Sequence, residues 1–140
     1  MIPITVVDVR DAEDLVVEVL RSGAIAQGPM VKRFEDAFAA VSGTKHAIAV
    51  NNGTTALVAA LQVLDLKPGD EVITSPFTFV ATLNAILEAG ATVRFADIRR
   101  DDFAIDPDAV ARAVTDRTKV LMPVHLYGQT ADMGKLAPLA

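Results

Sequence analysis

Four short segments follow apolar runs of the sequence, and they hold the residue types best suited to bind a ligand. They are Asn51-Asn52-Gly53-Thr54-Thr55, Ser75-Pro76-Phe77-Thr78-Phe79, the turn at Asp97, and Val124-His125-Leu126-Tyr127-Gly128-Gln129. In an open α/β sheet, ligands bind beyond the carboxyl ends of the strands, where such turns lie. Each turn is therefore a candidate for contact with a ligand.

The first turn has the chemistry of a phosphate site. Gly53 lets the backbone approach a ligand closely, and the start of the following helix offers unpaired N–H groups at the positive end of the helix dipole. A simpler role also fits, because Asn and Thr are common N-caps, so that Asn52 or Thr54 could cap the helix without any ligand. From this turn alone, both interpretations stay open.

The other turns carry aromatic and titratable side chains. Phe77 and Phe79 stand out in a chain with 5% aromatic residues, and either ring could stack on a planar cofactor or belong to the core. Asp97 could bind a substrate or cap the chain locally. His125 and the single tyrosine, Tyr127, could supply a general acid or a hydrogen bond to a substrate, although a lone histidine also fits a structural role. His46 begins an expected strand and so lies at the edge of the expected sheet opposite the candidate turns, where a functional role is not expected.

Several other chemistries leave no trace in the sequence. There is no G-x-G-x-x-G, G-x-x-x-x-G-K-[ST], G-x-S-x-G or H-E-x-x-H pattern, so dinucleotide, ATP, serine-hydrolase and zinc-protease motifs are missing. The chain has no cysteine, which excludes disulfides, zinc–thiolate sites and a cysteine nucleophile. The acidic residues are scattered, and we expect no metal site.

Composition limits the partners of the protein. The 140 residues carry a net charge of −5, and 51% of them are apolar, which predicts one folded domain or a large piece of one. Lys and Arg form no basic stripe, so we expect no nucleic acid partner. We find no signal peptide and no apolar run of the roughly 20 residues that span a bilayer. We therefore expect a soluble, cytoplasmic protein with no membrane partner.

Apolar periodicity predicts the elements that position the four turns. Expected strands are residues 46–50, 71–74, 92–96 and 120–126, and expected helices are residues 12–22, 30–42, 54–64, 78–88 and 107–114. Gly43 should end the second helix, and Asp106 followed by Pro107 should begin the last one. This alternation predicts an α/β fold with a mainly parallel sheet and helices on both faces. Residues 133–140 read as the next covering helix, so we expect residues 1–140 to be an incomplete portion of a domain.

Taken together, the turns resemble the DegT/StrS family of pyridoxal-phosphate (PLP) dependent sugar aminotransferases. The similarity covers about residues 20–140 and includes Gly-Asp-Glu-Val-Ile at 69–73, Phe-Thr-Phe-Val-Ala-Thr at 77–82 and Val-His-Leu-Tyr-Gly at 124–128. The combination of these strings is specific for that family. The resemblance implies the N-terminal portion of the large domain of a fold type I, aspartate-aminotransferase-like enzyme, which works as a homodimer with its active sites at the subunit interface.

The resemblance also assigns roles to individual residues. It implies that Thr54 and Thr55 hold the phosphate of PLP, that Gly53 permits the close approach, and that Phe79 stacks on the pyridine ring, while Phe77 stays a core candidate. Family members often have Ser at position 52 and Ala at position 55, where this chain has Asn and Thr. Both differences retain the backbone N–H donors, so they leave the phosphate assignment intact.

The resemblance places the central catalytic groups outside these residues. PLP chemistry needs a Schiff-base lysine and a carboxylate beside the pyridinium nitrogen, and the family has both after the position of Ala140. The five lysines present lie outside the family's lysine motif; they are Lys32, Lys45, Lys67, Lys119 and Lys135. We therefore expect no catalytic residue within residues 1–140, and we expect this segment to be inactive alone.

The resemblance leaves the reaction itself open. Most members of the family transfer an amino group from glutamate or glutamine to a keto-sugar nucleotide. Others carry histidine at the lysine position and remove a hydroxyl group as sugar dehydratases. A third possibility, from a different class of protein, is a non-catalytic α/β binding module.

Overall fold

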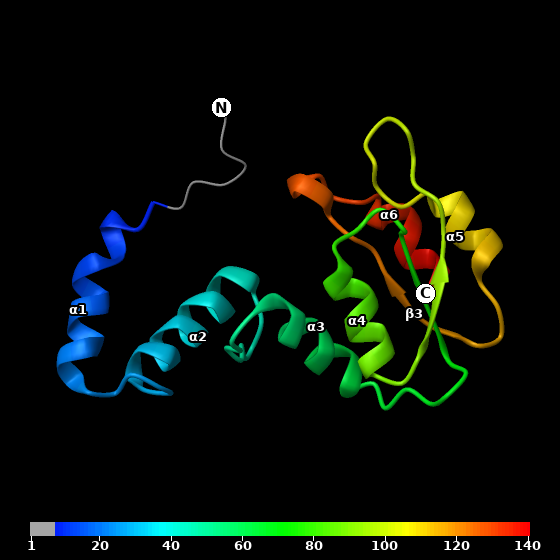
Figure 1. The fold of residues 1–140 in the computed structure, drawn as a ribbon. Coiled ribbons are helices and arrows are strands. Elements are labelled where there is room, and N and C mark those ends of the chain that lie inside the picture. The colour runs from blue at the N-terminus through cyan, green and yellow to red at the C-terminus, as the bar shows by residue number, and fades with distance from the viewer. Residues whose placement is uncertain (1–7) are drawn as a thin grey trace. The chain divides into compact units, whose positions relative to one another are not determined.

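The computed structural model describes residues 8–140. They form two compact units that meet in sequence between Ala49 and Val50. The first unit is helical and the second contains the sheet (Figure 1). The assignment of residues 1–140 to a single incomplete domain stays a prediction.

The first unit contains a short 3-10 turn and two helices. These are η1 (Arg10–Ala12), α1 (Glu13–Ser22) and α2 (Pro29–Ser42). Pro29 starts α2 at a position where its missing N–H costs nothing. Gly23 and Gly43 end the two helices in the left-handed conformation, with φ of 72° and 66°, which is the common glycine stop. The predicted stop at Gly43 is confirmed.

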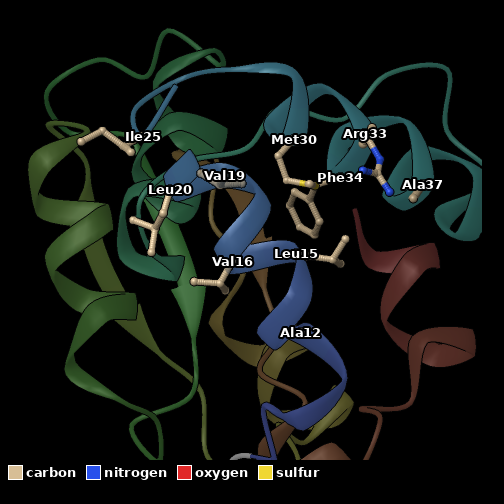
Figure 2. A pocket seen from close by; sticks show the side chains of 10 residues that line it. All are labelled: Ala12, Leu15, Val16, Val19, Leu20, Ile25, Met30, Arg33, Phe34 and Ala37. Atoms are coloured by element: carbon tan, nitrogen blue, oxygen red, sulfur yellow. The ribbon is translucent and has the colours of Figure 1, made fainter. Parts of the chain in front are cut away.

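The two helices of this unit enclose an open apolar groove of about 620 Å³ (Figure 2). Its lining residues are Ala12, Leu15, Val16, Val19, Leu20, Ile25, Met30, Arg33, Phe34 and Ala37. Arg33 is the only charged side chain among them. The groove therefore has the surface of a packing interface and lacks the polar groups that chemistry needs.

The second unit is built around a parallel sheet. Its elements are α3 (Gly53–Gln62), β1 (Glu71–Thr74), α4 (Val80–Glu88), β2 (Thr92–Phe95), α5 (Pro107–Ala113), β3 (Thr118–Met122), η2 (Leu126–Gly128), α6 (Met133–Leu136) and η3 (Ala137–Leu139). The strand order is β2-β1-β3, and β1 pairs with both neighbours in parallel. The predicted cap of α5 is confirmed, because Asp106 accepts a hydrogen bond from the Asp108 N–H at 3.1 Å.

Helices cover both faces of this sheet, as the sequence predicts. Val72 and Ile73 are adjacent in β1, fully buried and on opposite faces. Val72 packs with Val58, Leu61, Ala85, Ile86 and Ala91, mostly from α3 and α4. Ile73 packs with Ala96, Ala104, Ile105, Ala109, Val110, Ala131 and Leu136, which include residues of α5 and α6. Figure 1 shows α4 and α5 on either side of the strands.

The expected strand at residues 46–50 is wrong. The segment has an apolar sequence but no ladder partner among the described residues. Ile48 is 84% exposed, and the Ala49 N–H donates instead to Glu35 Oε1 at 2.9 Å. A strand exists only when a neighbour pairs with it, and sequence pattern cannot supply that neighbour.

Two further boundaries differ from expectation because of proline. Strand β3 ends at Met122 instead of residue 126, since Pro123 has no N–H to donate to a ladder. The expected helix at residues 133–140 is only the single turn α6 followed by the 3-10 turn η3. Pro138 lies within that last turn and cannot make the hydrogen bond of an α-helix.

Candidate functional site

The carboxyl ends of β1 and β3 form the edge at which the candidate turns meet. Thr74 is the last residue of β1 and Met122 the last of β3. The Thr74 hydroxyl donates to the Met122 carbonyl at 2.8 Å and holds the two strand ends together. Because the strands are parallel, the turn before α4 and the turn after β3 leave the sheet at the same edge.

An open pocket of about 490 Å³ lies beside these turns. It is lined by Gly53, Thr54, Leu57, Thr78, Phe79, Ala81, Thr82, Val124, His125, Leu126 and Tyr127. Three of the four candidate turns therefore contribute to one cavity. Of the four residues expected to bind cofactor, the structure brings together Gly53, Thr54 and Phe79, whereas Thr55 is not in the lining.

The start of α3 supplies one wall of the pocket. Asn52 is the N-cap of this helix, and its Oδ1 accepts hydrogen bonds from the Thr55 N–H at 2.9 Å and from the Thr55 hydroxyl at 3.3 Å. The capping interpretation is thus confirmed for Asn52. Gly53 and Thr54 are the first two helical residues, so their N–H groups have no acceptor within the helix. A β-carbon added at Gly53 would meet no atom within 4 Å, which shows open space beside this backbone.

Phe79 supplies the second wall. It is the N-cap residue of α4, its side chain makes no capping hydrogen bond, and the residue is 73% exposed. The Ser75 hydroxyl shapes the turn before it by accepting the Phe77 N–H at 3.0 Å. The ring of Phe79 is therefore presented to the pocket and not packed in the core.

Phe77 is the expected core residue of this turn, and this expectation is wrong. Phe77 is partly exposed and lies edge-on to Phe103, with ring centroids 6.0 Å apart. The turn between β1 and α4 leaves its ring at the surface. Phe77 does not line the pocket.

The turn after β3 supplies the third wall. The His125 Nδ1 accepts a hydrogen bond from the Ala131 N–H at 3.2 Å, and the His125 carbonyl accepts from the Gly128 N–H at 3.3 Å. Because Nδ1 is an acceptor, a neutral His125 carries its proton on Nε2. Tyr127 lies in the turn that these two hydrogen bonds close, and it is 92% exposed.

The remaining candidate, Asp97, lies outside the pocket. Its Oδ1 accepts the Ile98 N–H at 2.8 Å, and its carbonyl accepts the Asp106 N–H at 2.9 Å. Both hydrogen bonds organise the connection between β2 and α5. Asp97 therefore has a local structural role in this unit.

Sequence reasoning missed two hydroxyl groups in the pocket lining. Thr78 Oγ1 and Thr82 Oγ1 lie 2.9 Å apart within hydrogen-bonding distance. Thr82 is buried. Thr78 precedes Phe79, the N-cap of α4, and Thr82 lies in the first turn of that helix. The Thr-x-x-x-Thr pattern around the helix start is the signal that could have identified them.

The opposite edge of the sheet carries an ionic cluster that sequence reasoning also missed. Glu71 begins β1 and is 4% exposed. Its carboxylate accepts hydrogen bonds from the Thr115 hydroxyl at 2.6 Å and from Arg117 Nη2 at 2.7 Å, and Arg94 lies 3.7 Å away. These contacts, with Thr115 first and Arg117 second, hold the pKa of Glu71 below its ordinary value. The cluster ties the first residue of β1 to the turn before β3.

Together, these features define an α/β protein with its candidate ligand site at the carboxyl edge of a parallel sheet. A sequence model of the DegT/DnrJ/EryC1/StrS aminotransferase family matches residues 8–140, and the chain belongs to this family.

Relatives of known description agree with this assignment. The chain is 50% identical to the spore coat polysaccharide biosynthesis protein SpsC of Bacillus subtilis over 125 residues, which cover 89% of this chain and 32% of SpsC. Among solved structures, it is similar to Spr1654 of Streptococcus pneumoniae, described as a sugar aminotransferase in its PLP form. That similarity has a TM-score of 0.92 and 38% identity, over 99% of this chain and 36% of the other.

A third relative has a different reaction in its name. The chain is similar to the structure of a GDP-4-keto-6-deoxymannose-3-dehydratase, with a TM-score of 0.90 and 27% identity over 99% of this chain and 38% of the other. The chain spans about a third of the length of each of these relatives. Within residues 8–140, no helix has both the length and the apolar character needed to cross a membrane.

Proposed function

We propose that the protein binds pyridoxal phosphate in the pocket at the carboxyl edge of the sheet and transfers an amino group to a sugar. The observation that carries this proposal is the convergence of Gly53, Thr54 and Phe79 on one pocket. A helix start and an exposed aromatic ring are the two features that the phosphate and the ring of this cofactor require. Membership of an aminotransferase family supports the same conclusion.

The residues present fit the cofactor. The N–H groups of Gly53 and Thr54 have no intrahelical acceptor and lie at the positive end of the α3 dipole, which suits a phosphate. The space beside Gly53 is open, so phosphate oxygens can approach the backbone. The Thr55 N–H donates a hydrogen bond to Asn52 and so takes part in the cap of α3. Direct contact between Thr55 and the cofactor stays a prediction.

Each wall then has a distinct task. The start of α3 holds the phosphate, and the Phe79 ring stacks on the cofactor ring and fixes its orientation. Leu57 and Ala81 add apolar surface that excludes water from one side. When bound, pyridoxal phosphate supplies a pyridinium ring that accepts electrons from the reacting bond. None of the five lysines lines the pocket, and we propose that the lysine and the carboxylate of the reaction come from polypeptide outside these 140 residues.

For the substrate, we propose a keto-sugar nucleotide, with glutamate or glutamine as amino donor. The dehydratase relative is named for a nucleotide-linked keto sugar, and SpsC is named for polysaccharide biosynthesis.

We also propose that the protein works in the cytoplasm as a homodimer, as the family resemblance implies. Sedimentation of the full-length gene product checks the dimer, and a monomer that binds cofactor would contradict it.

Dehydration is the second candidate reaction, favoured by the dehydratase relative. Incubation of the full-length gene product with PLP, glutamate and a keto-sugar nucleotide distinguishes the two. An aminotransferase yields an amino sugar and 2-oxoglutarate, whereas a dehydratase yields a deoxy sugar. A protein that binds PLP and yields neither product from a panel of keto-sugar nucleotides would support the non-catalytic module.

The cofactor site is tested by substitution of Phe79. In the full-length gene product, we expect Phe79→Ala to weaken PLP binding roughly threefold to tenfold, because aromatic stacking contributes about 0.5–1.5 kcal/mol. Phe79→Tyr should retain the wild-type affinity. Phe77→Ala is the matched control, because Phe77 lies in the same turn but does not line the pocket. Equal affinities for Phe79→Ala and wild type, measured by absorbance titration, would remove the stacking role.

A further inference from the structure

Tyr127 has an uncommon backbone conformation at the pocket. Its φ is 52° and its ψ 27°, in the left-handed region. This region is unfavourable for residues with a β-carbon, and Asn or Gly adopts it more readily than Tyr. The next residue, Gly128, is also left-handed, with a φ of 84°. The backbone therefore turns sharply at the position that carries the single tyrosine of the chain.

His125 fixes this turn at both of its ends. The His125 carbonyl accepts the Gly128 N–H, and the His125 ring accepts the Ala131 N–H through Nδ1. Ala131 is 2% exposed and belongs to the core around Ile73. The turn is thus anchored to the core of the unit, and it keeps Tyr127 at the pocket.

The ring of Tyr127 is almost fully exposed, so packing within the described unit does not offset the strain of this backbone conformation. The residue is 92% exposed, so nothing within residues 8–140 covers it. A purely structural turn would be more stable with Asn or Gly at this position. Unfavourable backbone conformations persist where the surrounding structure enforces them, and they concentrate at functional sites. This contrast points to a ligand as the partner of the ring.

We propose that Tyr127 is a substrate-contacting residue that recognises the sugar of the acceptor. The inference rests on the proposed function, in which the start of α3 and the Phe79 ring bind the cofactor. The wall formed by the turn after β3 then remains for the second ligand. The Tyr127 ring offers an apolar face to the C–H groups of a sugar, and its hydroxyl can donate to or accept from a sugar hydroxyl.

Three variants of the full-length gene product test this role. Tyr127→Asn removes the ring and keeps a residue that tolerates the left-handed region, so we expect an unchanged or higher melting temperature and a KM for the keto-sugar nucleotide raised about fivefold to tenfold. Tyr127→Phe removes only the hydroxyl and should raise this KM about threefold. PLP affinity should stay at the wild-type value in both.

Phe103→Asn is the matched control. Phe103 is also an exposed aromatic residue with a left-handed backbone, at φ 59°, but it does not line the pocket. We expect this variant to leave the KM for the keto-sugar nucleotide unchanged. A KM that rises equally in Phe103→Asn and Tyr127→Asn would overturn the assignment, because it would reflect a general structural effect.

Other outcomes separate this inference from the proposed function. If wild-type protein binds PLP and transfers the amino group while Tyr127→Asn keeps its KM, only the role of Tyr127 is wrong. If Tyr127→Asn lowers the melting temperature or dissociates the dimer, the ring packs against protein, and the role is again wrong. If wild-type protein binds no PLP at all, the proposed function itself fails, and the role of Tyr127 fails with it.

Discussion

Under the proposed function, cofactor binding and folding stability make opposite demands on Gly53. It is the first residue of α3, and an added β-carbon would meet no protein atom within 4 Å. We therefore expect Gly53→Ala to leave the free energy of unfolding unchanged or to raise it by up to about 0.5 kcal/mol, since Ala favours the helix. The same methyl group enters the space assigned to the phosphate, so PLP affinity should fall about tenfold or more.

Gly134→Ala provides the comparison for this prediction. Gly134 also lies in the first turn of a helix, and an added β-carbon there makes an ordinary contact with Asp132 Oδ1 at 3.5 Å, outside the pocket. Thermal melting and a PLP titration of both variants measure the two effects. An affinity of Gly53→Ala equal to that of Gly134→Ala would show that no phosphate lies against this backbone.

At the scale of single residues, sequence reasoning located most of the pocket. The turns with Phe79 and His125 follow β1 and β3, and a parallel sheet brings such turns to one edge, so their meeting could be predicted. Gly53 and Thr54 line the same pocket although the strand expected before them is not formed. The left-handed conformation of Tyr127 could not be predicted, because it depends on hydrogen bonds that the His125 carbonyl and ring accept from the Gly128 and Ala131 N–H groups.

At the scale of the elements, the stop of α2 gives a direct prediction. Gly43 has a φ of 66°, and a β-carbon there would meet no neighbouring atom. We expect Gly43→Ala to lower the free energy of unfolding by about 1 kcal/mol through backbone strain alone. Gly43→Asn should lower it less, because Asn tolerates this region. Chemical denaturation of the three proteins measures the difference, and equal stabilities would contradict the assigned backbone conformation.

The elements that sequence reasoning placed correctly carry their own signals. Asp106 and Pro107 mark the start of α5 by local chemistry, and β1 has the bounds expected from its apolar run. Residues 46–50 have a similarly apolar sequence but form no strand in the described structure, because strand pairing depends on segments far away in sequence. Proline accounts for the early end of β3, and its effect on the ladder outweighs the apolar residues that follow.

At the scale of the whole sheet unit, Glu71 predicts a dependence of stability on acid. The pKa of Glu71 is lowered in the folded state by Thr115 and Arg117. The stability that this carboxylate contributes is therefore complete above the pKa of the unfolded chain, near pH 4.3. It is lost as the pH falls through the lower pKa of the folded state.

Glu71→Gln tests this linkage. The substitution leaves two arginines beside an uncharged group, so the melting temperature at pH 7 should fall. The difference between variant and wild type should shrink below about pH 4, where the wild-type carboxyl also loses its charge. Thermal melts from pH 3 to pH 7 measure it. A difference that stays constant over this range would assign the loss to packing and not to charge.

The hydrogen bond between Thr74 and Met122 joins residues 48 positions apart in the sequence, and from this separation we expect β3 to join β1 late in folding. Pairing of remote parallel strands is slow, because the chain must close a long loop before the contacts compensate for the lost entropy. The third wall of the proposed site therefore forms only once β3 has joined β1. A ligand that recognises only the completed pocket should then slow unfolding and leave the refolding rate unchanged.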